Sequence, residues 1–445
     1  MKRWGWVAVL VVGVGLGVGQ AVSWGAKAEP AVENNEDIYK ELELFEHALS
    51  IVRSDYVEEP QAKQLVYGAL KGMLATLDPY SQFMDPDSYN ELKVDTEGEF
   101  GGLGIEITIK DDLLTVISPI DGTPAEKAGL RSGDRIVKIN GELTRGITLL
   151  EAVKKLRGKP RTKVGLTVFR EGESELKEVE LERAVITIES IREASILEDR
   201  IGYIRLSDFR EKSADDLEAA LRKLKDQSME GLILDLRNNP GGLLDIAVSV
   251  AELFLSKHQL IVSTKGRLKN QNQELRARAD GLMKDLPLVV LVNEGSASAS
   301  EIVAGAVQDH HRGVLIGTKT HGKASVQTIF PLKDGSALRL TTSKYFTPAG
   351  RSIHGQGILP DVGVPFERPA EEGKADKKDK EKKDEPDGED IFDRVEQKEP
   401  KNGPSGKELA ARKRTDNQLA RAIDLLKGLR VYQEKVEVPA GSPHS

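Results

Sequence analysis

The chain has 445 residues, 39% hydrophobic and 31% charged, which is long enough for about three domains with separate cores. Its formal net charge of -8 argues against nucleic acid as the main partner. It contains no cysteine, which excludes disulfides, zinc-thiolate sites and thiol catalysis, so covalent chemistry must use Ser, Thr, Lys or His.

Residues 1–28 have the pattern of an export signal. Lys2 and Arg3 precede an apolar run over residues 4–24, and Ala26-Lys27-Ala28 fits a small-x-small cleavage site. The run is also about 20 residues long, enough to span a bilayer, so an uncleaved inner-membrane anchor is an open alternative. In both cases we expect the body of the protein in a periplasmic or other extracytoplasmic location.

The pattern of apolar and polar residues changes several times along the rest of the chain, which predicts a multidomain fold of α+β and α/β parts. Residues 35–96 are helical in pattern and include the turn "LDPYSQFMDPDSY". Residues 97–183 predict a compact mixed domain, and residues 184–366 predict a mainly parallel sheet covered by helices. Residues 367–405 have the composition of a disordered charged linker, and residues 406–435 predict an amphipathic C-terminal helix.

The stretch "NEGSASASEIV", residues 293–303, places serines on alternate positions directly before an apolar helical pattern. Ser298 stands at the helix start, and Ser298 with Glu301 fits a capping box in which the hydroxyl accepts a backbone N–H. The same position also suits a nucleophile, because free N–H groups at a helix start can hold an oxyanion. The serine pattern alone leaves both interpretations open.

A base near Ser298 would decide between them. His310 and His311 fail on distance, because at ~1.5 Å per residue they lie roughly 18 Å away along the same helix. The loop after the following strand, "TKTHGKASVQ", should return beside Ser298 and offers Lys319, His321 and Lys323.

The earlier strand "LILDLR" brings "NNPGG" to the same edge of the sheet, where Gly241 and Gly242 allow backbone N–H groups to approach a substrate. Residues 317–323 also match a phosphate-binding G-x-x-x-x-G-K pattern. However, Ala324 stands where a Ser or Thr would bind magnesium, and a hairpin pattern follows where a helix is required.

Five segments resemble the C-terminal processing, or tail-specific, serine peptidases in order and spacing, over about residues 40–365: "GYIRLSDF", "LILDLRNNPGG", "GSASASEIVAGAVQD", "GKASVQ" and "TPAGRSIHGQGILPDV". The resemblance implies Ser298 as nucleophile, Lys323 as general base and Gln327 as the residue that orients the lysine amine. It also implies an oxyanion hole made by the backbone N–H groups of Ala299 and Gly242. It implies no cofactor and no metal.

The chain departs from that family at two positions, with His321 where Phe is usual and Ala324 where Gly is usual. The first departure places a rival base beside the lysine. A lysine base needs a desolvated site that lowers its pKa. A contact from Lys323 to Gln327 requires a helical turn, because their alpha carbons would be about 13 Å apart in a strand. We therefore expect the hairpin to begin after Gln327.

Residues 97–183 resemble a PDZ domain, on "GGLGIEI" and "AEKAGLRSGDRIVKING". The resemblance implies that Gly102, Leu103, Gly104 and Ile105 hold the carboxylate and last side chain of an apolar peptide tail. It also implies that Arg157, in "KKLRGKP", couples an occupied PDZ domain to the core.

The sequence therefore predicts an extracytoplasmic serine endopeptidase that acts on unfolded or nonpolar-tailed envelope proteins. The alternative is a PDZ peptide-binding scaffold with a degenerate peptidase core, supported only by the departures at His321 and Ala324. An adaptor protein, a homo-oligomer and inner-membrane association through residues 4–24 are left open, and no nucleic-acid partner is expected.

Overall fold

A computed structural model describes residues 35–110, 112–173, 175–367 and 416–437. The predicted signal or anchor lies outside these residues, as does all but the first residue of the predicted linker. The chain divides into two compact units, residues 1–69 and 70–445. Within the described ranges, no helix has both the length and the apolar character needed to cross a membrane.

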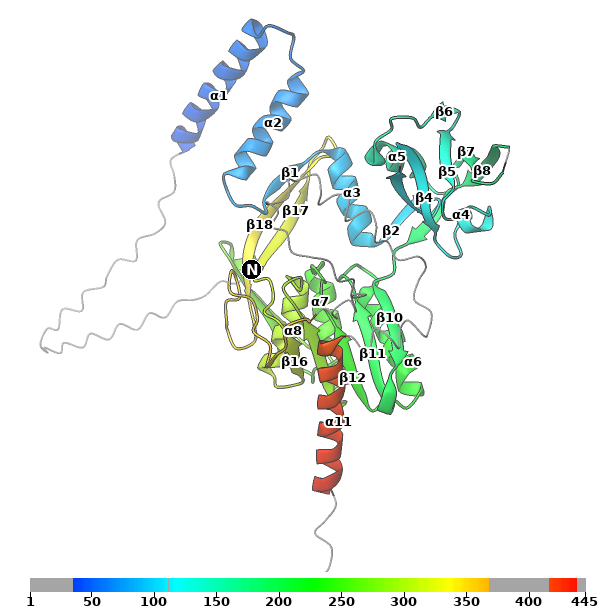
Figure 1. Ribbon diagram of the computed structural model, residues 1–445. Coiled ribbons are helices and arrows are strands. Elements are labelled where there is room, and N and C mark those ends of the chain that lie inside the picture. Colours follow the sequence, from blue (N-terminus) through cyan, green and yellow to red (C-terminus); the bar gives the residue numbers. More distant parts are fainter. Residues whose placement is uncertain (1–34, 111, 174, 368–415, 438–445) are drawn as a thin grey trace, which may run out of the picture. The chain divides into compact units, whose positions relative to one another are not determined.

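The helical pattern of residues 35–96 forms α1 (Asn35–Asp55), α2 (Ala62–Ala75) and α3 (Pro86–Glu97), with a short strand β1 (Gln82–Met84) before α3 (Figure 1). Helix α3 begins where Asp85 accepts a hydrogen bond from the Ser88 N–H at 2.9 Å, with Pro86 in the first turn. It ends at Gly98, whose φ of 72° is left-handed.

The predicted PDZ domain, residues 97–183, contains an antiparallel sheet with two short helices. Its strands pair in the order β3 (Ile105–Lys110), β4 (Leu113–Pro119), β5 (Arg135–Ile139), β7 (Lys163–Phe169) and β8 (Lys177–Glu182), and β6 (Glu142–Leu143) pairs with β5. Helices α4 (Pro124–Lys127) and α5 (Leu149–Leu156) complete it. Strand β3 lies at an edge of this sheet. The segments that enter and leave the domain pair with each other as β2 (Glu99–Gly102) and β9 (Ala184–Thr187).

Residues 184–366 contain a six-stranded sheet, and this confirms the predicted mainly parallel sheet. The strand order is β10 (Ile191–Ile196), β11 (Ile201–Leu206), β12 (Gly231–Asp235), β15 (Leu288–Val292), β16 (Val314–Gly317) and β19 (Val362–Gly363). Only β10 is antiparallel to its neighbour. The loops that follow β12, β15 and β16 therefore meet at one edge.

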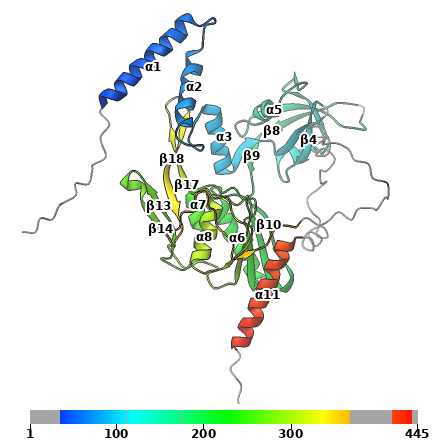
Figure 2. The same cartoon turned by 60° about the vertical axis from the view of Figure 1, so that its left-hand side comes forward.

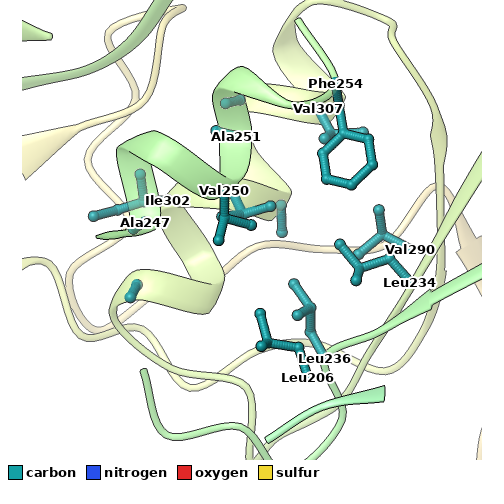
Figure 3. Packing of buried hydrophobic residues seen from close by; sticks show 14 of the residues in the cluster. Leu206, Leu234, Leu236, Ala247, Val250, Ala251, Phe254, Val290, Ile302 and Val307 are labelled. Atoms are coloured by element: carbon teal, nitrogen blue, oxygen red, sulfur yellow. The ribbon is translucent and has the colours of Figure 1, made fainter. Parts of the chain in front are cut away.

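Both faces of this sheet are covered. Helices α6 (Ser213–Asp226), α7 (Leu244–Glu252) and α8 (Ala299–Asp309) cover one face, where Leu234 and Val290 pack with Val250 and Phe254 (Figure 3). The strand side chains that point away from these helices pack against α11 (Asn417–Glu437) on the other face of the sheet. Figure 2 shows α11 in red. Burial on both faces explains the uninterrupted apolar run "LVVLV" of β15.

Helix α11 is described from Asn417, where the Asp416 carboxylate accepts hydrogen bonds from the Gln418 and Leu419 N–H groups. The predicted start of this helix at residue 406 lies outside the described residues. One predicted boundary is wrong. Strand β17 (Ser325–Pro331) begins before Gln327, so no helical turn separates Lys323 from Gln327. Its pairing with β18 (Ala337–Phe346) satisfies the backbone from Ser325 onward, with a register shift between Val326 and Gln327.

A second, antiparallel sheet carries the segment after the lysine loop. It joins β17 and β18 to β13 (Leu260–Gly266) and β14 (Gln273–Arg276). Strand β1 pairs with the first residues of β18 on the side away from β17, which brings the turn "LDPYSQF" from early in the chain to this sheet.

Candidate active site

Ser298 lies between β15 and α8 in a backbone conformation that is rare for a residue with a side chain. Its φ is 54° and its ψ is -111°. Such a conformation costs about 1–3 kcal/mol and persists only where the surroundings enforce it. Here the Ala297 N–H and the Ser300 hydroxyl both donate to the Asn239 carbonyl, at 3.0 and 2.9 Å. The Ser296 hydroxyl donates to the Leu236 carbonyl at 2.7 Å, so the two flanking serines are structural.

Ser298 and Glu301 cap α8 mainly through the backbone of Ser298. The Glu301 N–H donates to the Ser298 carbonyl and the Ser298 N–H donates to Glu301 Oε2, both at 2.9 Å. Among the described residues, no hydrogen bond is made by the Ser298 hydroxyl, which is therefore available for chemistry.

The "NNPGG" turn lies directly beside Ser298. A Cβ atom added to Gly241 would lie 2.8 Å from Ser298 Cβ, and one added to Gly242 would lie 2.2 Å from the Phe209 carbonyl oxygen. Both glycines have positive φ, 100° and 154°, so this close approach requires glycine. Within the described ranges, neither Gly242 N–H nor Ala299 N–H donates a hydrogen bond, and both residues line one pocket with Ser298.

Lys323 lines the same pocket from the loop after β16. Burial lowers the pKa of its amine below the ordinary value, and the Arg339 guanidinium lowers that pKa further. Its Nζ lies 4.7 Å from the centre of the Tyr80 ring. Among the described residues, no hydrogen bond joins Lys323 Nζ to Ser298 Oγ or to Gln327, and Gln327 Nε2 is buried without a partner.

The Glu301 carboxylate joins the nucleophile segment to the lysine loop. It is fully buried, and Oε2 accepts the N–H groups of Ser298 and Lys323, both at 2.9 Å. Oε1 accepts the Gly322 N–H at 2.7 Å and the Thr320 hydroxyl at 2.6 Å. Each oxygen therefore receives two donors, and one side chain fixes both reactive segments.

Tyr345 joins the same two segments from β18. Its hydroxyl shares its single proton between the Ser298 carbonyl, at 3.0 Å, and the Lys323 carbonyl. Burial raises the pKa of the Tyr345 phenol well above its ordinary value, which keeps the hydroxyl protonated as a donor.

The two departures from the family pattern have different surroundings. The His321 side chain is exposed to solvent, and its backbone N–H donates to the Ser296 carbonyl at 3.0 Å. Ala324 is fully buried, and its carbonyl accepts the Tyr345 N–H at 3.1 Å. His310 lies at the far end of α8, where its Nε2 contacts the Leu260 carbonyl at 2.6 Å.

The predicted tail-binding loop lies between β2 and β3. Gly102 ends β2, Leu103 is buried in the domain core, and Gly104 has a φ of 73°. In the described part of the chain, the N–H groups of Leu103 and Gly104 donate no hydrogen bond, so they are available to a carboxylate. Ile105 begins β3, whose free edge can accept a peptide strand.

Arg157 lies directly after α5, and its guanidinium carbon is 4.3 Å from the centre of the Phe100 ring in β2. The contact is therefore with the segment that enters the PDZ domain. Its coupling role stays a prediction.

Sequence reasoning missed Tyr80, Arg339 and Tyr345, and it assigned Glu301 only to helix capping. The "S-x-x-E" spacing was the one local signal for Glu301. The other three come from segments that are distant along the chain and carry no local signal. Within the described ranges, no cluster of His, Cys, Asp or Glu side chains could hold a metal ion.

Three family models match the chain: "Peptidase family S41" over residues 200–364, "PDZ domain" over residues 91–169, and "Activating protease CtpB N-terminal domain" over residues 19–88. The chain is 46% identical over 361 residues to a carboxy-terminal-processing protease of Bartonella bacilliformis, covering 80% of this chain and 82% of that protein. It is 40% identical over 323 residues to a carboxyl-terminal-processing protease of Synechocystis, covering 71% and 74%. Among solved structures, the photosystem II D1 C-terminal processing protease has 33% identity and a TM-score of 0.43, covering 72% of this chain and 86% of that one.

The backbone strain at Ser298 makes a stability prediction. Ser298→Gly should be more stable than Ser298→Ala by about 1 kcal/mol in urea unfolding, because glycine adopts a positive φ without strain. The matched control is Ser300, inside α8, where Gly should be less stable than Ala by about 0.5–1 kcal/mol. If the stability difference between the Gly and Ala variants had the same sign at both positions, the strain assigned to Ser298 would be contradicted.

Glu301→Gln should destabilise the protein by about 1–3 kcal/mol, because a side-chain amide in either orientation places an NH₂ group against two donors. Urea unfolding measures the loss. Glu294→Gln is the control, since Glu294 is exposed and, within the described part of the chain, accepts a hydrogen bond only from the Thr318 hydroxyl; it should change stability by less than about 0.5 kcal/mol. Similar stabilities of the two variants would mean that Glu301 does not join the two segments.

Proposed function

Because the chain belongs to the PDZ-containing C-terminal processing serine peptidases of family S41, we propose that it is an extracytoplasmic endopeptidase with a Ser298–Lys323 dyad. The observation that carries the proposal is one pocket lined by a strained serine, a half-buried lysine and two backbone N–H groups without partners. The extracytoplasmic location rests on the sequence of residues 1–28 alone.

The proposed reaction begins with a neutral Lys323 amine taking the proton of Ser298 Oγ as Oγ attacks the peptide carbonyl carbon. The carbonyl oxygen becomes an oxyanion and accepts hydrogen bonds from the Ala299 and Gly242 N–H groups. The Lys323 ammonium then returns its proton to the leaving amine, and the C–N bond breaks. A water molecule deprotonated by Lys323 hydrolyses the acyl-enzyme and restores the serine.

The environment of Lys323 supports this role. A lowered pKa increases the fraction of neutral amine at any pH below that pKa, so burial and Arg339 make more base available. Cleavage should therefore rise with pH until Lys323 is deprotonated. Gln327 would orient the amine after Lys323 has left its position over the Tyr80 ring.

The proposed substrates are unfolded or nonpolar-tailed envelope proteins. The unpartnered N–H groups of Leu103 and Gly104 beside the free edge of β3 would hold the substrate's terminal carboxylate, and buried Leu103 would contact its last side chain. An adaptor protein and self-association stay open as partners.

Ser298→Ala and Lys323→Ala should each lose cleavage of an unfolded protein ending in Ala-Ala by several orders of magnitude. The double variant should be little worse, because residues that act as a unit lose activity non-additively. His321→Phe is the control and should retain activity. If His321→Phe lost turnover and Lys323→Ala kept it, the base would be the histidine. If the unaltered chain bound the substrate without cleaving it, the protein would be a peptide-binding scaffold.

Amidation of the substrate's C-terminus should weaken its binding and cleavage, because the loop at Leu103 and Gly104 loses its carboxylate partner. Competition between free and amidated forms of one tail peptide measures the effect. The control is a peptide in which a carboxylate inside the chain, rather than the terminal one, is converted to an amide at the same distance from the cleavage site. Equal cleavage of both forms would remove the role proposed for this loop.

A further inference from the structure

The Lys323 amine lies over the face of an aromatic ring contributed by the turn before β1. Lys323 Nζ is 4.7 Å from the centre of the Tyr80 ring, and among the described residues it makes no hydrogen bond to Ser298. A ring face attracts a cation, which stabilises the ammonium form of a lysine. A general base must be neutral, so this contact opposes catalysis.

The position of Tyr80 is fixed by the turn that contains it. The Asp78 carboxylate accepts the N–H groups of Tyr80 and Ser81, at 2.8 and 2.9 Å, and the Ser81 hydroxyl at 2.7 Å. The turn is tied to β18, because the Thr341 N–H donates to Ser81 Oγ at 3.1 Å and Arg339 Nε donates to the Tyr80 carbonyl at 3.3 Å. The ring is therefore held beside the lysine by the sheet.

The pocket also holds two buried polar groups near Lys323. Gln327 Nε2 and Ser325 Oγ have no hydrogen-bond partners among the described residues. Leaving such groups unsatisfied costs about 1–3 kcal/mol each. Because Gln327 Nε2 is a donor, the lysine can satisfy it only with the lone pair of its neutral amine, so a move of the amine toward Gln327 becomes favourable once Lys323 is neutral.

We propose that Tyr80 is a positioning residue that holds the Lys323 ammonium in this resting arrangement, which the side chain leaves to take the proton of Ser298. The inference rests on the proposed function of the Ser298–Lys323 pair. It assigns a role to the turn "LDPYSQF", whose tyrosine ring controls how readily the base becomes neutral and reaches the nucleophile.

Several other ionisable groups contact the elements around Lys323. Arg339 and Tyr345 come from β18, Glu301 from α8 and Asp78 from the turn before β1, while His321 lies on the lysine's own loop with its ring in solvent. None of these is changed by a substitution at Tyr80, so a change in titration can be assigned to the ring.

The test is the pH dependence of kcat/KM for the full-length chain on an unfolded protein ending in Ala-Ala. Tyr80→Leu keeps an apolar cover but removes the ring, and should shift the acidic limb to lower pH by about half a unit to one unit. Below that limb, kcat/KM should rise about threefold to tenfold, because more Lys323 is neutral. Tyr80→Phe keeps the ring and should retain the original profile.

Tyr89→Leu is the matched control, because the Tyr89 ring also lies under a lysine, with Lys93 Nζ at 4.3 Å, but does not contact Lys323. Its profile should not shift. Thermal unfolding identifies a variant that fails to fold, and Tyr80→Met then replaces Tyr80→Leu. If the acidic limb of kcat/KM did not shift in a folded, active Tyr80→Leu or Tyr80→Met variant, the inference would be overturned. It would also be overturned if Tyr80→Phe had the same pH profile as Tyr80→Leu. Residual cleavage by Ser298→Ala would instead overturn the proposed function itself.

Discussion

The Glu301 carboxylate lies in the interior of the core and accepts hydrogen bonds from both segments that carry the reactive side chains. A buried carboxylate is costly unless its oxygens are satisfied, and here each oxygen has two donors. The arrangement therefore forms only when the Ser298 segment and the lysine loop are both in place. Tyr345 adds a second connection between their carbonyls. The geometry of the pocket depends on these two side chains.

The "NNPGG" turn is connected to the segments that enter and leave the PDZ domain through one short loop. Phe209 pairs with Gly242, and the next residue, Arg210, donates to the Asp95 and Ile188 carbonyls at 3.1 and 3.4 Å. The loop thus contacts Gly242, one of the two N–H donors proposed for the oxyanion, at one end. At the other end it contacts the segments that enter and leave the PDZ domain. These contacts give a physical basis on which tail binding could influence the pocket, beside the contact of Arg157 with Phe100.

Much of the fold was readable from local patterns, since apolar alternation and helical spacing depend on neighbouring residues. The parallel sheet and the meeting of its loops at one edge followed from strand-helix alternation. The one wrong boundary has a non-local cause, because β17 starts early where β18 pairs with it from Ser325 onward.

The sequence by itself supplied the proposed nucleophile and base through the resemblance of two short segments to a peptidase family, whereas residue type and spacing alone left Lys319, His321 and Lys323 open as bases. It also determined the glycines at 241 and 242, which backbone sterics require. Only the tertiary structure decided which groups surround the lysine amine. Tyr80 and its turn reach Lys323 through pairing with β18, where Asp78 and the Thr341 side chain that donates to it lie 263 positions apart in the chain. Burial and ring contacts across such separations arise from packing of the whole core, so no local pattern encodes them.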